Sequence, residues 1–267
     1  MPESREYPLL AVNRTSDGVV TVTLDDPDRR NAMTAPMTAS WQRIIAEIAE
    51  DEEARCVVVT GAGSAFCSGG DLGWIGAEPG APVDRLRDKM LPFYKIWLSI
   101  RDLPIPTIAA VNGPAVGAGA CLALACDLRY ATDTAKFAVP FTRLGMHPGM
   151  AATWLLPEVI GIANARELLY TGRAVSGAEA VALGVYNRVF PAAEFAGEVE
   201  RIAAGIAGSA PIAVKLTKEA LVGAGHESFE AAVRWEALAQ PITLATEDLQ
   251  EGLAAQREKR APRFTGR

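Results

Sequence analysis

Residues 106–127 read PTIAAVNGPAVGAGACLALACD and combine a strand, a glycine-rich turn and the start of a helix. The apolar run Thr107–Val111 predicts the strand, and the small apolar segment Cys121–Cys126 follows the glycines of residues 112–119. A strand that turns into a helix start presents free backbone N–H groups, where partial positive charge gathers. The stretch therefore predicts a place for an anion or a developing oxyanion. The alternative is a tight turn whose glycines only allow close packing.

A second stretch, Val57–Leu72, has a similar arrangement earlier in the chain and reads VVVTGAGSAFCSGGDL. Together the two stretches resemble the crotonase family, also called the enoyl-CoA hydratase/isomerase superfamily. The family pattern F-x-x-G-x-D-[LI] is matched by Phe66–Leu72, and the pattern N-G-x-A-x-G-G-G by residues 112–119, with Ala118 at the middle glycine of the final three. The match covers nearly the whole chain, because it continues at Phe137, Leu144–Gly149, Leu169–Gly172, Ala178–Gly184 and Ala245–Gly252.

Alternating and helical patterns of apolar residues predict the other elements. Strands are expected at Gly18–Leu24, Cys56–Thr60, Leu128–Ala131, Lys136–Ala138 and Asn187–Phe190. Helices are expected at Thr34–Asp51, Asp84–Arg101, Ala178–Leu183, Phe195–Ala207, Pro211–Val222, Phe229–Ala239 and Thr246–Glu258. Thr34 is expected to cap the first helix, and Ser176 with Glu179 fits a capping box.

The order of strands and helices predicts an α/β fold with parallel strands and crossover helices. The pattern alone does not distinguish a spiral from a doubly wound sheet. The resemblance implies a crotonase-like spiral of β-β-α turns, formed by residues 1–192, and a C-terminal helical module, residues 193–267. In the family this module builds a trimer interface, and two trimers commonly stack into a hexamer.

The composition limits the classes of partner. The chain has 267 residues, 49% of them hydrophobic, which suffices for one packed domain with an appendage. A net charge of −6 argues against nucleic acid, which binds clustered Lys and Arg. No apolar stretch reaches membrane-spanning length, and the N-terminus has no apolar signal segment. We expect a cytoplasmic protein with no membrane partner.

Metal sites and disulfides are not expected. The four cysteines form no C-x-x-C pair and the chain has only two histidines, which favours reduced thiols and no metal centre. The resemblance implies no cofactor, because coenzyme A is part of the substrate.

The resemblance implies chemistry on an acyl-CoA thioester, in which negative charge appears on the thioester oxygen as an enolate. The family's two backbone donors to that oxygen map by motif onto the N–H groups of Gly70 and Ala118. Two aligned donors can supply several kcal/mol, about 3 kcal/mol for each. The donor at Ala118 belongs to the backbone, so its departure from glycine changes only the side chain.

Both glutamates of the family's hydratases are missing. One of them lies three residues after the second donor, where this chain has Cys121. The other follows the proline after Phe137, where this chain has Phe141. Phenylalanine cannot transfer a proton, and its ring would exclude a nucleophilic water. Ordinary hydration is therefore not expected, and the family's isomerases, which generally use the second position, fit no better.

Three residues near the predicted donors are further candidates. His147 lies in a loop that resembles the water-holding segment of the hydratases, where it would act as acid or base or else bond to the backbone. Cys121 could be a nucleophile if its pKa were lowered, but a small buried thiol is favoured. Asp71 is expected to cap its own turn.

Coenzyme A has its own candidate contacts. The family places the adenine against the first turn, around Ala65 and Phe66, with cations from the turn that holds Arg29 and Ala32. A solvated charge is the alternative for Arg29. Lys259 is a candidate for the phosphates, including those bound to a neighbouring subunit. The residues predicted to bind acyl-CoA are Arg29, Ala32, Ala65, Phe66, Gly70, Asp71, Leu72, Phe141, Gly149 and Lys259, with acyl-pocket walls also at Trp74, Ile75, Met90 and Phe93.

These observations support three hypotheses. The first is an enzyme of the lyase or isomerase class in which the donors Gly70 and Ala118 act with His147 as proton carrier. The second is decarboxylation of a malonyl-type CoA, since loss of CO2 makes the enolate without a base. The third is a non-catalytic acyl-CoA-binding protein that has lost its acid and base.

Overall fold

The computed structural model describes residues 7–222 and 228–267, whose strands form two sheets. The larger sheet contains, in spatial order, β1 (Leu10–Arg14), β2 (Val19–Leu24), β3 (Cys56–Gly61), β4 (Thr107–Val111), β6 (Leu128–Thr132) and β9 (Arg188–Phe190). The smaller sheet contains β5 (Ala115–Val116), β7 (Lys136–Ala138) and β8 (Ala174–Ser176). Neighbouring strands run parallel, except that β1 is antiparallel to β2 and β7 to β8.

The two sheets are the layers of a spiral. β4 leads into β5 and β6 leads into β7, so each of these turns contributes one strand to each sheet. Single bridges between Met33 and Gly70, and between Cys67 and Ala115, join the two preceding turns to the same layer. A doubly wound protein would keep such strands in one open sheet. The predicted spiral of β-β-α turns is therefore confirmed.

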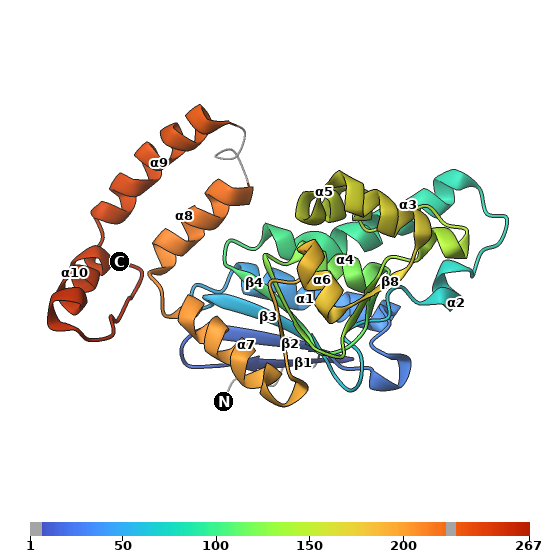
Figure 1. Ribbon diagram of the computed structural model, residues 1–267, viewed down its shortest axis with the longest axis horizontal. Helices are drawn as coiled ribbons and strands as arrows, with labels where there is room; N and C mark the ends of the chain where they lie inside the picture. Colours follow the sequence, from blue (N-terminus) through green and yellow to red (C-terminus); the bar gives the residue numbers. More distant parts are fainter. Residues whose placement is uncertain (1–6, 223–227) are drawn as a thin grey trace.

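Helices surround this spiral and continue beyond it (Figure 1). They are α1 (Ala35–Ala49), α2 (Leu72–Ile75), α3 (Val83–Leu98), α4 (Ala118–Ala125), α5 (Ala152–Thr171), α6 (Gly177–Leu183), α7 (Ala192–Ala207), α8 (Pro211–Val222), α9 (Phe229–Leu244) and α10 (Glu247–Glu258). Short 3-10 helices lie at Pro27–Arg29, Ser99–Asp102 and Phe141–Leu144.

The main hydrophobic core draws its side chains from the strands and from α1, α3, α4 and α5. In it Trp41 of α1 stacks on Trp97 of α3, with 4.9 Å between the ring centroids. A second cluster joins Phe195 and Val199 of α7 to Ile108 of the larger sheet. α8, α9 and α10 extend away from the side that carries α2 and α3 (Figure 1). The division after residue 192 stays a prediction, and α7, which follows it, packs on the sheet.

Several predicted elements have the expected bounds, among them Thr107–Val111, Lys136–Ala138 and α8. Ser176 caps α6, because its side chain accepts a hydrogen bond of 3.3 Å from the backbone N–H of Glu179. Thr34 occupies the N-cap position of α1, but its side chain makes no cap hydrogen bond. The predicted cap at Thr34 is therefore correct in position only.

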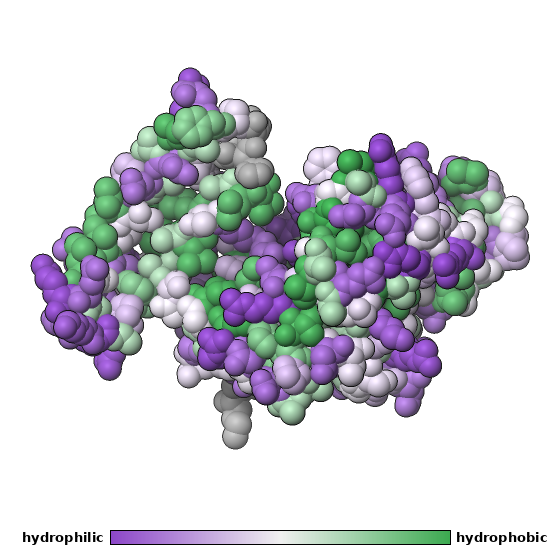
Figure 2. Space-filling model, in the orientation of Figure 1, coloured by the Kyte–Doolittle hydropathy of each residue, from purple (hydrophilic) through white to green (hydrophobic). Residues whose placement is uncertain are grey.

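Exposed apolar side chains gather on α8 and α9, and Figure 2 shows hydrophobic surface along both helices. They include Leu221, Val222, Phe229, Val233, Leu238, Ile242 and Leu244. Within residues 7–222 and 228–267, no helix is long and apolar enough to cross a membrane.

A partly buried ion pair joins α8 to the spiral. Lys218 of α8 donates hydrogen bonds of 2.8 Å to the Asp127 carboxylate and to the Ile105 carbonyl oxygen. The same Asp127 oxygen accepts from the Thr107 backbone N–H at 2.7 Å and from its hydroxyl at 2.9 Å. The Lys218 side chain is 9% exposed and the Asp127 side chain 27%, so solvent screens this pair less than it would a fully exposed one.

We expect Lys218→Met to lower the free energy of unfolding by about 2 kcal/mol, because Asp127 loses its cation but keeps Thr107. Urea unfolding followed by circular dichroism measures the change. Lys215→Met is the matched control, since Lys215 lies on the same helix and makes no ion pair with the residues that the structure describes. Equal midpoints for the two variants would show that the pair does not hold α8.

Candidate active site

A small pocket lies where the two glycine-rich turns meet α3 and the loop before α5, and it encloses about 100 Å³. Six residues predicted to act at the site line it, namely Gly70, Leu72, Phe141, Gly149, Ala118 and His147. The predicted acyl-pocket residues Ile75, Met90 and Phe93 line it too. The rest of the lining includes Ser68, Tyr94, Leu144, Met146 and Met150.

The backbones of the two turns touch directly. The backbone N–H of Val116 donates to the Cys67 carbonyl oxygen at 3.0 Å. A Cβ on Gly69 would lie 2.7 Å from the Val116 carbonyl oxygen and 3.2 Å from the Ala118 nitrogen. A Cβ on Gly119 would overlap the Cys67 carbonyl oxygen and lie 2.7 Å from Cys67 Cβ. These glycines therefore permit close packing, and that packing brings Gly70 and Ala118 to one pocket.

Two pocket-lining residues have a backbone N–H group without a partner in the part of the chain that the structure describes. Ala118 is the first residue of α4, where an N–H group has no acceptor within the helix. The N–H groups of Gly70 and Ala118 donate to no acceptor in the described ranges 7–222 and 228–267. Both residues line the pocket.

Among the described residues that line the pocket there is no Asp, Glu, Lys or Arg. The Phe141 ring is buried and its Cζ atom would lie 4.0 Å from a Cβ on Gly117. The ring thus lies against the second glycine turn, next to Ala118. The wall around the two free N–H groups is apolar, which strengthens any hydrogen bond that they make.

Cys121 lies behind this wall rather than in it. Its thiol is fully buried and donates at 3.8 Å to the Gly149 carbonyl oxygen. Burial raises the pKa of the Cys121 thiol well above its ordinary value, so the thiol stays protonated at neutral pH. A protonated thiol is a poor nucleophile, and the structure favours the small buried thiol over the nucleophile.

His147 is exposed at the pocket, and its Nδ1 atom lies 2.8 Å from the Pro148 carbonyl oxygen. A carbonyl oxygen only accepts hydrogen bonds, so Nδ1 carries the hydrogen in this contact. Nε2 of the neutral ring is then free to take up a proton. The two readings of His147, backbone contact and proton carrier, are compatible in this geometry.

Tyr94 of α3 is the pocket residue that sequence reasoning missed. A Cβ on Gly149 would overlap the Tyr94 hydroxyl oxygen and lie 2.9 Å from Cζ, so the hydroxyl reaches the loop that carries His147. Burial, and to a lesser degree the nearby Cys121 thiol, raises the pKa of Tyr94. A signal existed, because residue 94 is four positions after Met90 and therefore shares its helix face.

The residues predicted to contact the adenine and phosphates of coenzyme A lie outside this pocket lining. Arg29, which is exposed, pairs at 2.8 Å with the buried Asp26 carboxylate. The buried Asn31 side chain donates to the carbonyl oxygens of Ala65 at 2.8 Å and Phe66 at 3.2 Å, which ties the Arg29 turn to the first glycine turn. The Ala65 and Phe66 side chains are buried, so only their backbone can meet a ligand.

Three other predicted residues also lie outside the lining. Ala32 is half-buried in the Arg29 turn. Asp71 caps α2 by accepting from the Trp74 backbone N–H at 2.6 Å, as expected for a structural aspartate. Lys259 follows α10, which lies at the opposite end of the molecule from α2 (Figure 1). A role for Lys259 on a phosphate therefore stays a prediction about a neighbouring subunit.

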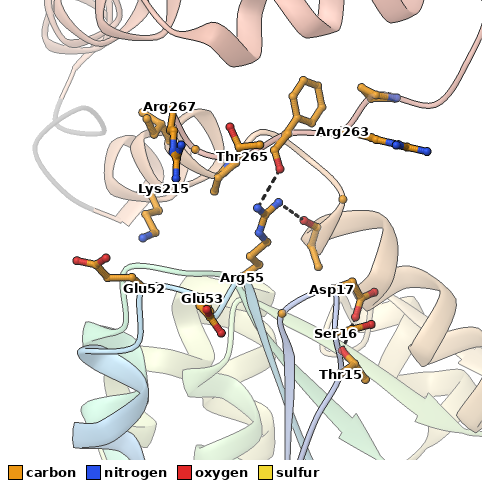
Figure 3. Close-up of a pocket in the computed structure, with 18 residues that line it drawn as sticks. Thr15, Ser16, Asp17, Glu52, Glu53, Arg55, Lys215, Arg263, Thr265 and Arg267 are labelled. Atoms are coloured by element: carbon orange, nitrogen blue, oxygen red, sulfur yellow. Dashed lines mark hydrogen bonds between the residues drawn. The ribbon is translucent and has the colours of Figure 1, made fainter.

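A larger pocket of about 950 Å³ lies between the loop before β2 and the C-terminal residues (Figure 3). At its centre Arg55 donates to the carbonyl oxygens of Ala207 at 3.2 Å and Phe264 at 2.9 Å. Its other charged residues have both signs, namely Asp17, Glu52, Glu53, Lys215, Arg263 and Arg267. None of the predicted site residues lies among its described lining residues. Arg55 links the tail to the body here.

Comparisons with known proteins agree with the fold and with the site motifs. The family model described as enoyl-CoA hydratase/isomerase matches residues 14–267. The 1,2-epoxyphenylacetyl-CoA isomerase of Escherichia coli is 34% identical over 96% of this chain and 98% of its own. A mitochondrial enoyl-CoA hydratase domain-containing protein of Bos taurus is 35% identical over 98% and 89%. The crystal structure of an enoyl-CoA hydratase from Bacillus anthracis has a TM-score of 0.91 at 34% identity, covering 97% of this chain and all of that one.

Proposed function

This chain belongs to the enoyl-CoA hydratase/isomerase family, and from that membership we propose that it binds an acyl-CoA thioester and stabilises the thioester's enolate. The proposed donors to the enolate oxygen are the backbone N–H groups of Gly70 and Ala118. The observation that carries the proposal is that both groups line one apolar pocket and have no acceptor among the described residues. Two such donors supply several kcal/mol when charge develops on the bound oxygen.

Ordinary hydration of an enoyl-CoA fits this pocket poorly. Hydration needs a base to activate water and an acid to protonate the α-carbon. The described lining residues include no carboxylate, and the Phe141 ring occupies the wall beside Ala118. We propose His147 as the group that exchanges protons with solvent, since it is exposed at the pocket.

Decarboxylation of a malonyl-type CoA is the reaction that we favour. Cleavage of the bond to the carboxylate leaves the electron pair on the α-carbon as an enolate, so no base is required. No Lys or Arg lies among the described lining residues to stabilise the carboxylate before CO2 leaves. A non-catalytic acyl-CoA binder is the second candidate, favoured by the same lack of acid and base.

We also propose a location and an assembly. The exposed apolar side chains on α8 and α9 support self-association into a trimer or hexamer (Figure 2). The turn with Arg29 and Ala32, the Ala65–Phe66 backbone, and Asp71 with Leu72 are proposed to hold coenzyme A, with Lys259 reaching a neighbouring subunit. The cytoplasm is the proposed compartment.

Three thioesters test the proposed function. Acetoacetyl-CoA reports enolate stabilisation without turnover, because its enolate absorbs in the ultraviolet, and we expect binding to lower its apparent pKa. Crotonyl-CoA should be hydrated at least about 100-fold more slowly than by a hydratase with both carboxylates. Methylmalonyl-CoA should release CO2, more slowly in His147→Ala.

The outcomes separate the candidates. Binding of all three thioesters without any product would favour the binder over the decarboxylase. Crotonyl-CoA turnover equal to that of ordinary hydratases would contradict the proposal.

A further inference from the structure

Tyr94 places a hydroxyl group in a pocket whose other walls are mostly apolar. Its oxygen lies against Gly149, at the side of the pocket that α3 forms. The ring is fixed by Phe93, whose centroid lies 6.2 Å away in an edge-to-face arrangement. In the described part of the chain the Tyr94 hydroxyl has no hydrogen-bond partner. This half-buried hydroxyl can therefore bond to a ligand in the pocket or to water.

Few other groups in this pocket carry a proton that could be transferred. Among the described lining residues only Ser68, Tyr94 and His147 have a polar hydrogen on the side chain. The Ser68 hydroxyl donates to the Arg29 carbonyl oxygen at 3.3 Å, outside the pocket lining. His147 is exposed to solvent, and its Nδ1 atom lies against the Pro148 carbonyl oxygen. Tyr94 is half-buried, and its raised pKa keeps it protonated throughout the neutral range.

We propose that Tyr94 is the catalytic acid that protonates the α-carbon of the bound enolate. The step rests on the proposed function, since the enolate must first be held by the Gly70 and Ala118 N–H groups. Loss of CO2 breaks the bond between the α-carbon and the carboxylate and leaves its electron pair in the enolate. The α-carbon then forms a bond to the Tyr94 hydroxyl proton, and the resulting phenolate takes a proton from solvent.

The energetics favour this direction of transfer. The α-carbon of a thioester is a far weaker acid than a phenol. Transfer of the proton from the Tyr94 oxygen to the α-carbon is therefore favourable in free energy, even though burial makes Tyr94 a weaker acid. The reverse transfer would need a phenolate, which the raised pKa of Tyr94 disfavours at neutral pH. Protonated Tyr94 can therefore donate a proton to an enolate, but it is poorly suited to remove an α-proton from a thioester.

Tyr94→Phe tests the step, because it removes one oxygen atom that makes no hydrogen bond to the described residues. We expect the steady-state kcat for conversion of methylmalonyl-CoA to propionyl-CoA to fall about 100-fold and KM to fall with it, because Tyr94 acts after CO2 has left. In D2O the wild-type protein should give propionyl-CoA with deuterium on one face of the α-carbon, and the variant a mixture of both faces. Tyr170→Phe is the matched control, since Tyr170 is exposed on α5 and absent from the pocket lining.

The apparent pKa of bound acetoacetyl-CoA distinguishes failure of the Tyr94 step from failure of the proposed enolate stabilisation. Tyr94→Phe should lower the apparent pKa of bound acetoacetyl-CoA as much as the wild-type protein does, because the N–H donors are intact. If the wild-type protein leaves that pKa unchanged, the result contradicts both the proposed enolate stabilisation and the proposed Tyr94 step. If the pKa is lowered and CO2 release is equally fast and stereospecific in both proteins, only the Tyr94 step is overturned. If the pKa is lowered but the wild-type protein releases no CO2, decarboxylation is overturned together with the Tyr94 step.

Discussion

Replacing Ala118 by proline should reduce kcat for CO2 release about 100- to 1,000-fold, the largest loss that we expect from any single change in the pocket wall. Proline has no backbone N–H, so this variant deletes one of the two proposed donors. Ala118 is the first residue of α4, where proline is well tolerated because that N–H makes no intrahelical bond. Activity should therefore be lost from a protein that still folds.

The apparent pKa of bound acetoacetyl-CoA provides the direct measurement for Ala118→Pro. The variant should lower that pKa much less than the wild-type protein. Ala118→Gly is the control, since it removes the methyl group and keeps the N–H, and it should behave as wild type. A proline variant that folds and retains full enolate stabilisation would exclude Ala118 as a donor.

Gly119→Ala should lower the free energy of unfolding by about 3 kcal/mol and abolish enolate stabilisation. The added Cβ would overlap the Cys67 carbonyl oxygen and lie 2.8 Å from the Cys67 carbonyl carbon. Both are backbone atoms, so a side-chain rotation cannot relieve the overlap. The two turns must separate, which moves the N–H groups of Gly70 and Ala118 apart.

Urea unfolding and acetoacetyl-CoA binding together measure the effect of Gly119→Ala. The matched control is Gly197→Ala, because Gly197 lies inside α7 with no atom within 4 Å of an added Cβ. That change should stabilise the protein by about 0.5–1 kcal/mol and leave binding intact. Wild-type stability in Gly119→Ala would show that the turns are not in tight contact.

The sequence was sufficient for elements with a clear apolar pattern. Thr107–Val111 is an unbroken apolar run inside the larger sheet, and its bounds agree with β4. α9 was predicted to end at Ala239, yet it continues to Leu244 with Pro241 inside the helix, a residue that disfavours helix in its interior. β5 and β8 have only two and three residues, so their pairing depends on neighbours from distant turns.

α5 was absent from the predicted helices for a physical reason. Its apolar residues do not follow a single face, because Trp154, Ile162 and Tyr170 are exposed while the other apolar residues are mostly buried. Pro157 and the positive φ of Gly161 interrupt the pattern further. Such a segment has no amphipathic periodicity in its sequence, so the helix could be identified only from the folded structure.

The residues of the candidate site were likewise predictable only in part from the sequence. Gly70 and Ala118 could be proposed because their turns carry a family motif, and the pocket lining contains both. Tyr94 belongs to no motif, and its place in the lining depends on how α3 meets the loop around Gly149. That contact joins residues distant in sequence, so helix periodicity alone could not distinguish Tyr94 from an ordinary surface tyrosine.

The smaller sheet joins the two glycine turns through main-chain contacts, such as the bridge between Cys67 and Ala115. The frame that presents residues 70 and 118 thus depends on main-chain contacts, while the side chains at positions 121 and 141 pack beside it. In this chain those two side chains are a cysteine and a phenylalanine. One scaffold can in this way host reactions that share an anionic intermediate but differ in how protons arrive and leave.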